Sequence, residues 1–117
     1  MNYSITTSSY FNAVAKRLAK KYPSFKEDLK NFRKELLENP QQGTELSPGI
    51  RKVRMAIKAK GKGKSGGARV ITYNFLTAEM DGKIVLLLIY DKEDASSVKV
   101  NVLKEIIKEE GFPLQKP

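Results

Sequence analysis

A run of basic residues between positions 51 and 69 is the part of this sequence best suited to chemistry. Eight cations fall within nineteen residues, with no Asp or Glu among them: Arg51, Lys52, Arg54, Lys58, Lys60, Lys62, Lys64 and Arg69. The whole chain has a formal net charge of +9, so the excess of positive charge is a local feature. Glycines interrupt the second half of the run, which predicts a basic strand leading into a basic loop. Such a segment can surround a polyanion with cations, and the polyanion it favours is nucleic acid.

The lack of acidic residues within this run is a second argument for an anionic partner. Adjacent cations repel each other, and proteins usually tolerate that cost only where an anion binds. The alternative is a solvated edge strand whose charges block aggregation. We favour the anionic partner. If six of the cations met phosphates, affinity would fall with salt with a log–log slope of about −4 to −5.

Strand alternation groups several of these cations with an aromatic residue. Lys52, Arg54 and Lys58 fall on one face of their predicted strand, and Arg69 and Tyr73 fall on one face of the next. The pattern therefore predicts one patch with an arginine, a tyrosine and several lysines. Two interpretations of Tyr73 stay open: a half-buried aromatic of the sheet, or a platform on which a base stacks.

Two other motifs have simpler interpretations. Gly63-Lys64-Ser65 resembles the end of a phosphate-binding P-loop, but the full pattern needs a glycine where Lys58 stands and a helix afterwards. The spacing of Asp91, Glu93 and Asp94 in a predicted loop, without a histidine, is weak evidence for a metal site. We interpret them as a solvated turn or a helix cap. We therefore expect no metal and no cofactor.

Composition limits the chemistry further. A chain of 117 residues predicts a single domain over residues 1–117. It contains no cysteine, which excludes disulfides and fits a reducing compartment, and no histidine, the usual acid–base residue at neutral pH. Catalysis would therefore rest on Lys, Arg, Tyr or carboxylates. The longest apolar run, residues 84–90, is too short to cross a bilayer, and we expect no signal peptide.

Hydrophobic periodicity predicts the elements that must position the basic run. A short first strand is followed by two helices, which Pro23 separates and which form an antiparallel hairpin. Thr7, Ser8 or Ser9 caps the first helix, and Ser24 caps the second, with Glu27 completing a capping box. The predicted ranges are a strand at 2–6 and helices at about 9–22 and 24–39.

The second half of the chain predicts mainly strands. A loop at 40–50 precedes strands at 51–59 and 68–76, with a glycine-rich loop at 60–67 between them. Asp81-Gly82 predicts a tight hairpin turn, and the uniformly apolar segment 84–90 predicts a central strand covered on both faces. A polar loop at 91–97 leads to a final helix that ends near Gly111. The fold class is therefore α+β: a small antiparallel sheet with an N-terminal two-helix hairpin and a C-terminal helix.

Several pieces of the sequence, taken in order, resemble one known family. The stretch from Lys64 to Ile71 is followed by Asp81-Gly82-Lys83 and then by the apolar strand that ends in Tyr90-Asp91-Lys92. Over residues 10–110 this order is similar to the RelE/HigB-like toxins of bacterial type II toxin–antitoxin systems. The resemblance implies a small cytoplasmic mRNA interferase, an endoribonuclease that enters the ribosomal A site, cuts the mRNA there and so inhibits translation. It also implies a cognate antitoxin as partner, no membrane association and no small-molecule cofactor.

RNA cleavage of this kind begins when a 2′-hydroxyl attacks the adjacent phosphate. The reaction needs a base, positive charge at the phosphorane and an acid for the leaving 5′-oxygen. By its position after the Gly-Gly loop, Arg69 is the strongest carry-over from the family and would be the charge stabiliser. Lys58 and Lys60 are the favoured bases, because crowding among cations lowers the pKa of a lysine. Lys62 and Lys64 follow closely.

The family also carries a basic residue and a catalytic tyrosine near its C-terminal end. The matching stretch here, residues 92–98, has Lys92 but no tyrosine, so Tyr90 and Tyr73 are the nearest substitutes. The residues assigned to RNA binding are Arg51, Lys52, Arg54, Lys62, Lys64 and Tyr73. Two alternatives remain open: a ParE-like poison of DNA gyrase, and a non-catalytic RNA-binding module that uses the same basic patch.

Overall fold

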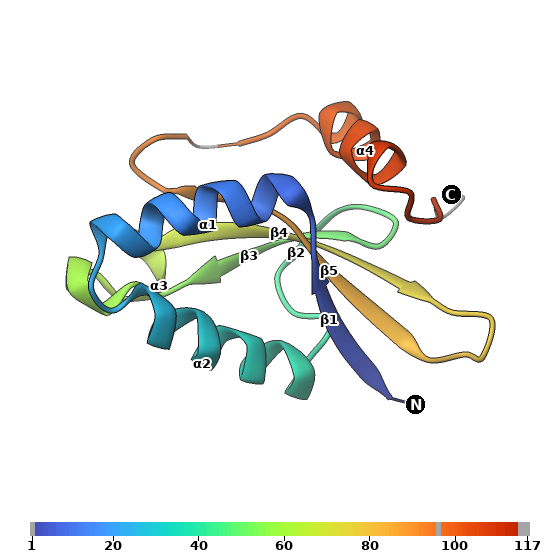
Figure 1. Ribbon diagram of the computed structural model, residues 1–117, viewed down its shortest axis with the longest axis horizontal. Coiled ribbons are helices and arrows are strands. Elements are labelled where there is room, and N and C mark those ends of the chain that lie inside the picture. Colours follow the sequence, from blue (N-terminus) through green and yellow to red (C-terminus); the bar gives the residue numbers. More distant parts are fainter. Residues whose placement is uncertain (1, 96, 115–117) are drawn as a thin grey trace.

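The uniformly apolar segment at 84–90 lies at the centre of the fold in the computed structural model, which describes residues 2–95 and 97–114 (Figure 1). It belongs to a five-stranded sheet with the order β1-β5-β4-β3-β2. The strands are β1 (Tyr3–Thr7), β2 (Thr44–Ser47), β3 (Ile50–Met55), β4 (Ala68–Leu76) and β5 (Gly82–Asp91). The prediction of an α+β fold is confirmed. The sheet is mixed, however, because β1 pairs with β5 in parallel while the other neighbours are antiparallel.

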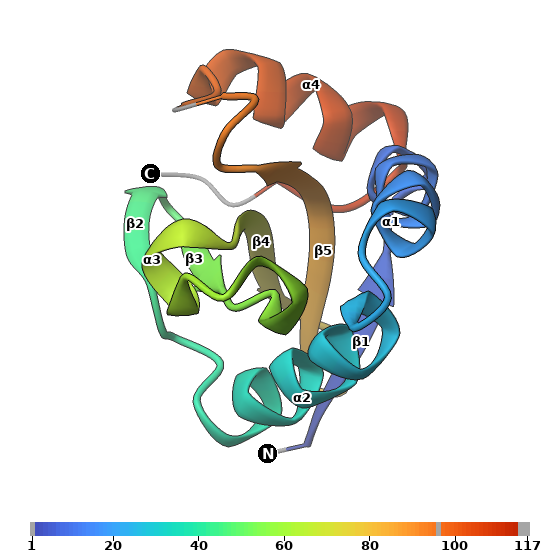
Figure 2. The ribbon, with the colours of Figure 1, turned by 90° about the vertical axis from the view of Figure 1, so that its left-hand side faces the viewer.

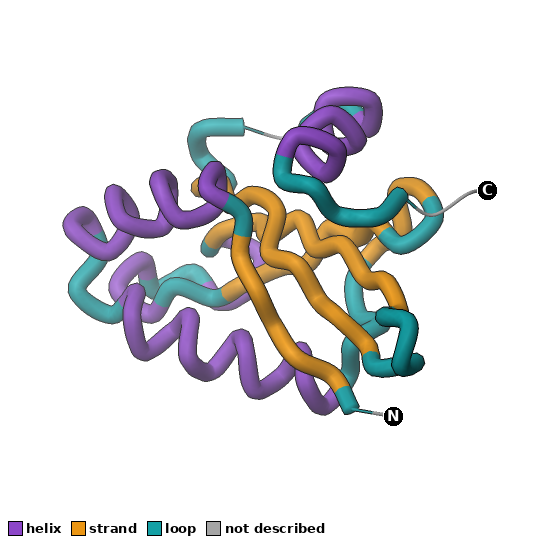
Figure 3. Tube along the Cα trace, turned by 45° about the vertical axis from the view of Figure 1, so that its right-hand side comes forward, coloured by secondary structure: helices purple, strands orange, loops and turns teal. Residues whose placement is uncertain are grey.

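Helices cover both faces of the sheet. The helix pair α1 (Ser9–Lys21) and α2 (Phe25–Glu38) packs on one face, and α4 (Val100–Glu109) packs on the other. Figure 2 shows α4 on the far side of β5 from α2, and Figure 3 shows α1 and α2 running in opposite directions, as the sequence predicts. The predicted final helix is confirmed.

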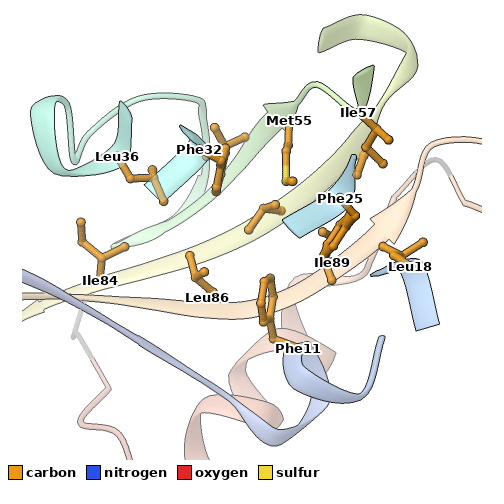
Figure 4. Close-up of a cluster of buried hydrophobic side chains, with 13 residues drawn as sticks. Phe11, Leu18, Phe25, Phe32, Leu36, Met55, Ile57, Ile84, Leu86 and Ile89 are labelled. Carbon is orange, nitrogen blue, oxygen red and sulfur yellow. The ribbon is translucent and has the colours of Figure 1, made fainter. Parts of the chain in front are cut away.

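Two clusters of buried side chains form the core, one on each face. The first joins Phe11 and Leu18 of α1 and Phe32 of α2 to strand residues such as Leu86 (Figure 4). The second joins the α4 stripe to the opposite side of the same strands, including Leu87 of β5. Because both faces of β5 are buried, every one of its central side chains is apolar, which accounts for the continuous hydrophobic run in the sequence.

Serine residues begin both helices of the hairpin, but in different ways. Ser8 caps α1, since its Oγ accepts a hydrogen bond from the Phe11 N–H at 3.0 Å and donates one to the Leu87 carbonyl at 2.6 Å. The predicted capping box at Ser24 is wrong, because this side chain makes no cap hydrogen bond. Its hydroxyl donates instead to the buried Asp28 carboxylate at 2.7 Å and accepts from the Ala59 N–H at 2.9 Å. Ser24 and Asp28 thus fasten α2 to the segment that follows β3.

The basic run is more structured than its glycines predict. β3 ends at Met55 rather than at residue 59, and it is followed by a turn of 3₁₀ helix, η1 (Lys58–Lys60), and a four-residue helix, α3 (Gly63–Gly66). β2 occupies part of the predicted loop at 40–50. A bulge between Glu45 and Ser47 interrupts its pairing with β3, which fits a short edge strand.

The β4–β5 turn differs from the Asp81-Gly82 hairpin turn that the sequence predicts. The turn spans 77–81, where the Thr77 N–H donates to the Asp81 carbonyl at 2.8 Å and Met80 takes the left-handed backbone conformation with φ 67°. Gly82 is already the first residue of β5 and lies under the Tyr3 ring, which a Cβ would contact at 2.2 Å. The glycine at this position therefore serves the β1–β5 contact rather than the turn.

Candidate nucleic-acid interface

Three candidate site residues form a row across adjacent strands. Arg54 of β3 is the direct partner of Arg69 of β4, and Arg69 is the direct partner of Tyr90 of β5. Directly opposite residues project from the same face of a sheet, with Cβ atoms about 4.5–5.5 Å apart. Like charges in such positions repel each other. The row therefore places two cations and a phenol where an anion would relieve repulsion.

A groove with a volume of about 530 Å³ opens beside this row. One wall comes from β2 and the loop before it, and another comes from the segment after β5. The described lining residues are Gln42, Gly43, Thr44, Lys52, Val53, Arg54, Lys64, Arg69, Lys92 and Ala95. Five of these side chains are cationic and none of the lining residues in this set is acidic. The groove is therefore a concave, positively charged surface of the kind that attracts a phosphate backbone.

The loop that contains α3 orients Arg69. Its guanidinium donates to the backbone carbonyls of Ser65 at 3.1 Å, Ala68 at 3.3 Å and Lys64 at 3.4 Å. Within residues 2–95 and 97–114, no carboxylate lies within ion-pair distance of Arg69 or Arg54. The peptide dipoles thus hold Arg69 in place without neutralising its charge.

Lys60 lies in a different environment from the one the sequence predicts. Its side chain is 4% exposed, and its Nζ lies 2.5 Å from Oδ1 of Asp91, whose side chain is fully buried. The same Nζ donates to the Gly67 carbonyl at 3.2 Å, and the Tyr22 hydroxyl donates to Oδ2 of Asp91 at 2.5 Å. The interpretation of Asp91 as part of a solvated turn is therefore wrong.

The pKa values of this buried pair move in the directions expected of a salt bridge. Burial lowers the pKa of Lys60, but the hydrogen bond and charge of Asp91 outweigh it, so the net pKa is raised above 10.5. Burial raises the pKa of Asp91, yet the hydrogen bonds from Lys60 and Tyr22 lower it from 3.8 to about 2. Lys60 is thus a protonated structural residue. The proposed role of Lys60 as a base is not supported, since crowding by cations was expected to lower its pKa.

Carboxylates from distant parts of the chain neutralise other members of the basic run. Lys62 lies 3.3 Å from Glu93, and Lys64 lies 3.2 Å from Glu35. Arg51, which alternation places on the face opposite Arg54, lies 3.5 Å from the carboxylate of the edge strand β2. The repulsion inferred from the isolated run is therefore partly offset. The cations of the groove that form no ion pair among the described residues are Lys52, Arg54, Arg69 and Lys92.

Two further predicted residues do not join the groove. Lys58 is exposed in η1, its backbone N–H donates to the Asp28 carboxylate at 3.1 Å, and it is not among the described lining residues. Tyr73 is fully buried in the α4-side core, and its hydroxyl donates to the Pro113 carbonyl at 2.5 Å. Of the two interpretations of Tyr73, the aromatic of the sheet is the one the structure supports, since a base cannot stack on a ring without exposed area.

Tyr90 is the residue of the row whose hydroxyl group is buried. It is 8% exposed, and its hydroxyl has no hydrogen-bond partner among the described residues. Burial raises the pKa of its phenol, and the charge of Arg69 opposes that shift. Tyr90 lines a neighbouring, mostly apolar hollow of about 410 Å³, which meets the groove at Ala95. An unpaired buried hydroxyl is costly and requires an explanation.

Sequence reasoning missed the wall formed by 42–44 and the anchoring role of Tyr22. Gly43 could have been a signal for the wall, since it takes a φ of 93° and a Cβ there would lie 2.5 Å from the Lys52 carbonyl. In the part of the chain that the structure describes, no cluster of acidic, Cys or His residues could hold a metal ion. None of the described helices is long and apolar enough to cross a membrane. No model of a known protein family matches this chain.

Proposed function

We propose that this protein is an endoribonuclease that binds single-stranded mRNA in the cationic groove and cuts it there, as a RelE/HigB-like toxin would. The observation that carries this proposal is the row formed by Arg54, Arg69 and Tyr90. Two arginines without a described carboxylate partner face each other at one edge of a groove. A phosphate between them would accept charge-assisted hydrogen bonds from both guanidinium groups.

The reaction would be an attack of a ribose 2′-oxygen on the adjacent phosphorus. The 2′-hydroxyl gives up its proton to solvent, the O2′–P bond forms and the P–O5′ bond breaks, which leaves a 2′,3′-cyclic phosphate and a 5′-oxygen that takes up a proton to become a 5′-hydroxyl. Negative charge gathers on the non-bridging oxygens in the transition state, where fixed cations lower the barrier. Arg54 and Arg69 would supply that charge. Since backbone carbonyls already hold Arg69, little reorganisation would be needed.

Tyr90 is the proposed proton donor to the leaving 5′-oxygen. Because burial raises the pKa of its phenol above 10.0, the group carries its proton at neutral pH. The hydroxyl has no competing acceptor among the described residues. Proton transfer to the 5′-oxygen would complete the cleavage, and the nearby Arg69 would stabilise the phenolate that remains.

The remaining groove cations would bind the phosphates on either side of the cut. Lys52 is the next residue on the same face of β3 as Arg54, while Lys64 and Lys92 come from the segments before β4 and after β5. If all five groove cations met phosphates of a single strand, the log–log slope of affinity against salt would be about −3.5. Lys60 and Tyr73 have no part in this proposal, because both are buried and engaged elsewhere.

Primer extension on an mRNA in a purified translation system tests the proposal. The wild type and Arg69→Ala are compared with and without ribosomes, which the RelE-like mode of action requires. Cuts that appear only with ribosomes and intact Arg69 would support a ribosome-dependent interferase. If no cuts appear under any condition, the endoribonuclease proposal is wrong.

A non-catalytic RNA-binding module is the second candidate, and two observations favour it. Lys60, one of the two favoured bases, is committed to Asp91, and the Tyr90 hydroxyl is buried. On this reading Arg69→Ala would weaken RNA binding without changing the pattern of RNA fragments. Binding and cleavage measured on the same RNA separate the two candidates.

We also propose a cognate antitoxin as the partner, with both proteins acting in the bacterial cytoplasm. The groove cations without a described carboxylate partner provide a surface for an acidic segment of that antitoxin. Such a segment would compete directly with RNA. The proposal requires that adding the antitoxin displaces a labelled RNA strand, and that charge reversal at Arg54 weakens both complexes.

A further inference from the structure

A second cationic surface lies on the helices that cover the other face of the sheet from Arg54 and Arg69, and two of its cations, Arg17 and Lys21, also line the hollow beside Tyr90. It is formed by the outer sides of α1 and α2, which run side by side in opposite directions (Figures 1 and 3). We call it the hairpin surface, and its exposed cations are Lys16, Arg17, Lys20, Lys21, Lys26, Lys30, Arg33 and Lys34. In the described part of the chain, none of these eight side chains forms an ion pair.

The acidic residues of the two helices do little to balance this charge. α1 contains no acidic residue, and α2 contains four. Of these four, Asp28 is buried and bonded to Ser24, and Glu35 pairs with Lys64 of the basic loop. Only Glu27 and Glu38 remain to face solvent beside eight cations.

The spacing of the cations is unfavourable for a helix pair that meets only water. Like charges four residues apart on a helix destabilise it by about 0.2–0.5 kcal/mol per pair. Four such pairs are present: Lys16–Lys20, Arg17–Lys21, Lys26–Lys30 and Lys30–Lys34. The last turn of α1 benefits from Lys20 and Lys21 through the helix dipole, but no such benefit applies to the middle of α2. A bound polyanion would remove this repulsion.

From these observations we propose that the hairpin surface binds the phosphate backbone of double-helical RNA. The exposed side chains are mainly lysines, with no aromatic ring among the eight for bases to stack on, so the surface suits a duplex whose bases are already stacked. A repeat of four residues spaces the cations about 6 Å apart along each helix, which gives two rows of charge along a rod-like partner. The choice of RNA over DNA rests on the proposed function; the existence of the surface does not.

The groove and the hairpin surface would then bind different segments of RNA. α1 and α2 cover one face of the sheet, whereas Arg54 and Arg69 project from the other. A folded RNA held by the hairpin surface would leave the groove open for a single strand. The protein could thus be retained on a structured RNA assembly while it acts on an unpaired strand nearby.

Fluorescence anisotropy with the full chain tests this inference. One variant is K16Q/K20Q/K30Q, and its matched control is K99Q/K104Q/K108Q, which removes the same charge from exposed positions at or within α4. The probes are a labelled 16-base-pair RNA hairpin, the DNA hairpin of the same sequence and a 12-nucleotide single-stranded RNA. Circular dichroism melting checks that both variants fold.

For the RNA hairpin we expect K16Q/K20Q/K30Q to reduce the salt slope by about 2–3 and to weaken binding at least tenfold at 100 mM salt, while the control changes affinity less than threefold. If both variants weaken binding of the RNA hairpin equally, the loss follows from the lower net charge alone. That result would overturn the inference. Tighter binding of the DNA hairpin than of the RNA hairpin would overturn the choice of RNA. Binding of the single-stranded RNA should be equal in the wild type and K16Q/K20Q/K30Q, so a failure of the groove to bind RNA is detected separately.

Discussion

Lys60 and Asp91, which are 31 residues apart in the sequence, form a buried ion pair 2.5 Å long that closes the basic loop onto the end of β5. The pair also receives a hydrogen bond from Tyr22 at the end of α1. Three elements of the fold therefore meet at one carboxylate. The loop fixed in this way is the one whose carbonyls hold Arg69, so the ion pair supports the candidate site from beneath.

Removal of one partner of this pair should destabilise the protein strongly. Lys60→Met leaves the Asp91 carboxylate buried without its cation, which we expect to cost about 3–5 kcal/mol of unfolding free energy. The double variant Lys60→Met/Asp91→Leu should recover much of that loss, because no buried charge remains. Urea unfolding at pH 7 measures both. A Lys60→Met protein as stable as the wild type would contradict this account.

Acid should lower the free energy of unfolding over a defined pH range, because it protonates Asp91. Its pKa in the folded state is about 2, below the usual 3.8, so its contribution is complete above about pH 5 and is lost as the pH falls toward 2. A shift of this size corresponds to roughly 2 kcal/mol. Urea unfolding at pH 5, 4 and 3 should show the decline. Asp91→Asn, although less stable at pH 5, should show a shallower decline over the same range.

Gly67 should be far less tolerant of substitution than its neighbour Gly61. A Cβ at Gly67 would lie 2.1 Å from the Met55 carbonyl oxygen and 3.0 Å from the Ile57 nitrogen, so Gly67→Ala must push β3 and β4 apart. Gly61 has a φ of 68° but open space around it. For Gly61→Ala we expect a cost of about 1–2 kcal/mol from the left-handed backbone alone. Thermal melting of the two variants should rank Gly67→Ala as clearly the less stable.

Substitutions in the groove should separate catalytic cations from structural ones. We expect Arg69→Ala or Arg54→Ala to reduce cleavage about 10²–10³-fold, since each removes a charge from the transition state. Lys58→Ala should change cleavage less than threefold, because Lys58 does not line the groove. Cleavage rates of a defined mRNA on ribosomes provide the measurement. A large loss of cleavage in Lys58→Ala would restore the role of general base for which the sequence favours Lys58.

Tyr90→Phe should affect stability and function in opposite directions. The Tyr90 hydroxyl is buried without a described partner, so its removal should leave unfolding free energy unchanged or raise it by up to about 1 kcal/mol. Loss of the proton donor should slow cleavage at least a hundredfold. Tyr73→Phe, which loses the hydrogen bond to Pro113, is the matched control and should lose stability rather than cleavage. Full activity in Tyr90→Phe would exclude the phenol as the acid.

Periodicity was sufficient to predict α1, α2, α4, β4 and β5, because each has a long stripe or run that only one element accommodates. It could not predict that β1 joins β5 in parallel, since the pairing of residues as distant in sequence as Tyr3 and Gly82 leaves no local pattern. β2 was missed because Gly43, Pro48 and Gly49 suggest a loop on both sides of it. The prediction of a hairpin turn at Asp81-Gly82 failed because the sequence does not show whether a glycine is needed for a turn or for close packing against an aromatic ring.

The site was predicted in part for a similar reason. Arg54 and Arg69 were grouped correctly by strand alternation, which is a local rule. The acidic partners of Lys60, Lys62 and Lys64 come from α2, from the last residue of β5 and from the turn after it. Charge counting along the chain cannot reveal them. The burial of Tyr73 could not be predicted either. A tyrosine that contacts RNA and a tyrosine that packs in the core look the same in the sequence.

The parallel pairing of β1 with β5 also affects how the protein is made. A ribosome that has synthesised α1, α2 and even β3 has not yet produced the strand against which residues 3–7 pair. The carboxylate that anchors Lys60 appears later still, at the final residue of β5. Contacts between such distant segments form late and slow the folding of small domains. The nascent chain would therefore be unable to anchor the loop that holds Arg69 until most of its length had left the exit tunnel.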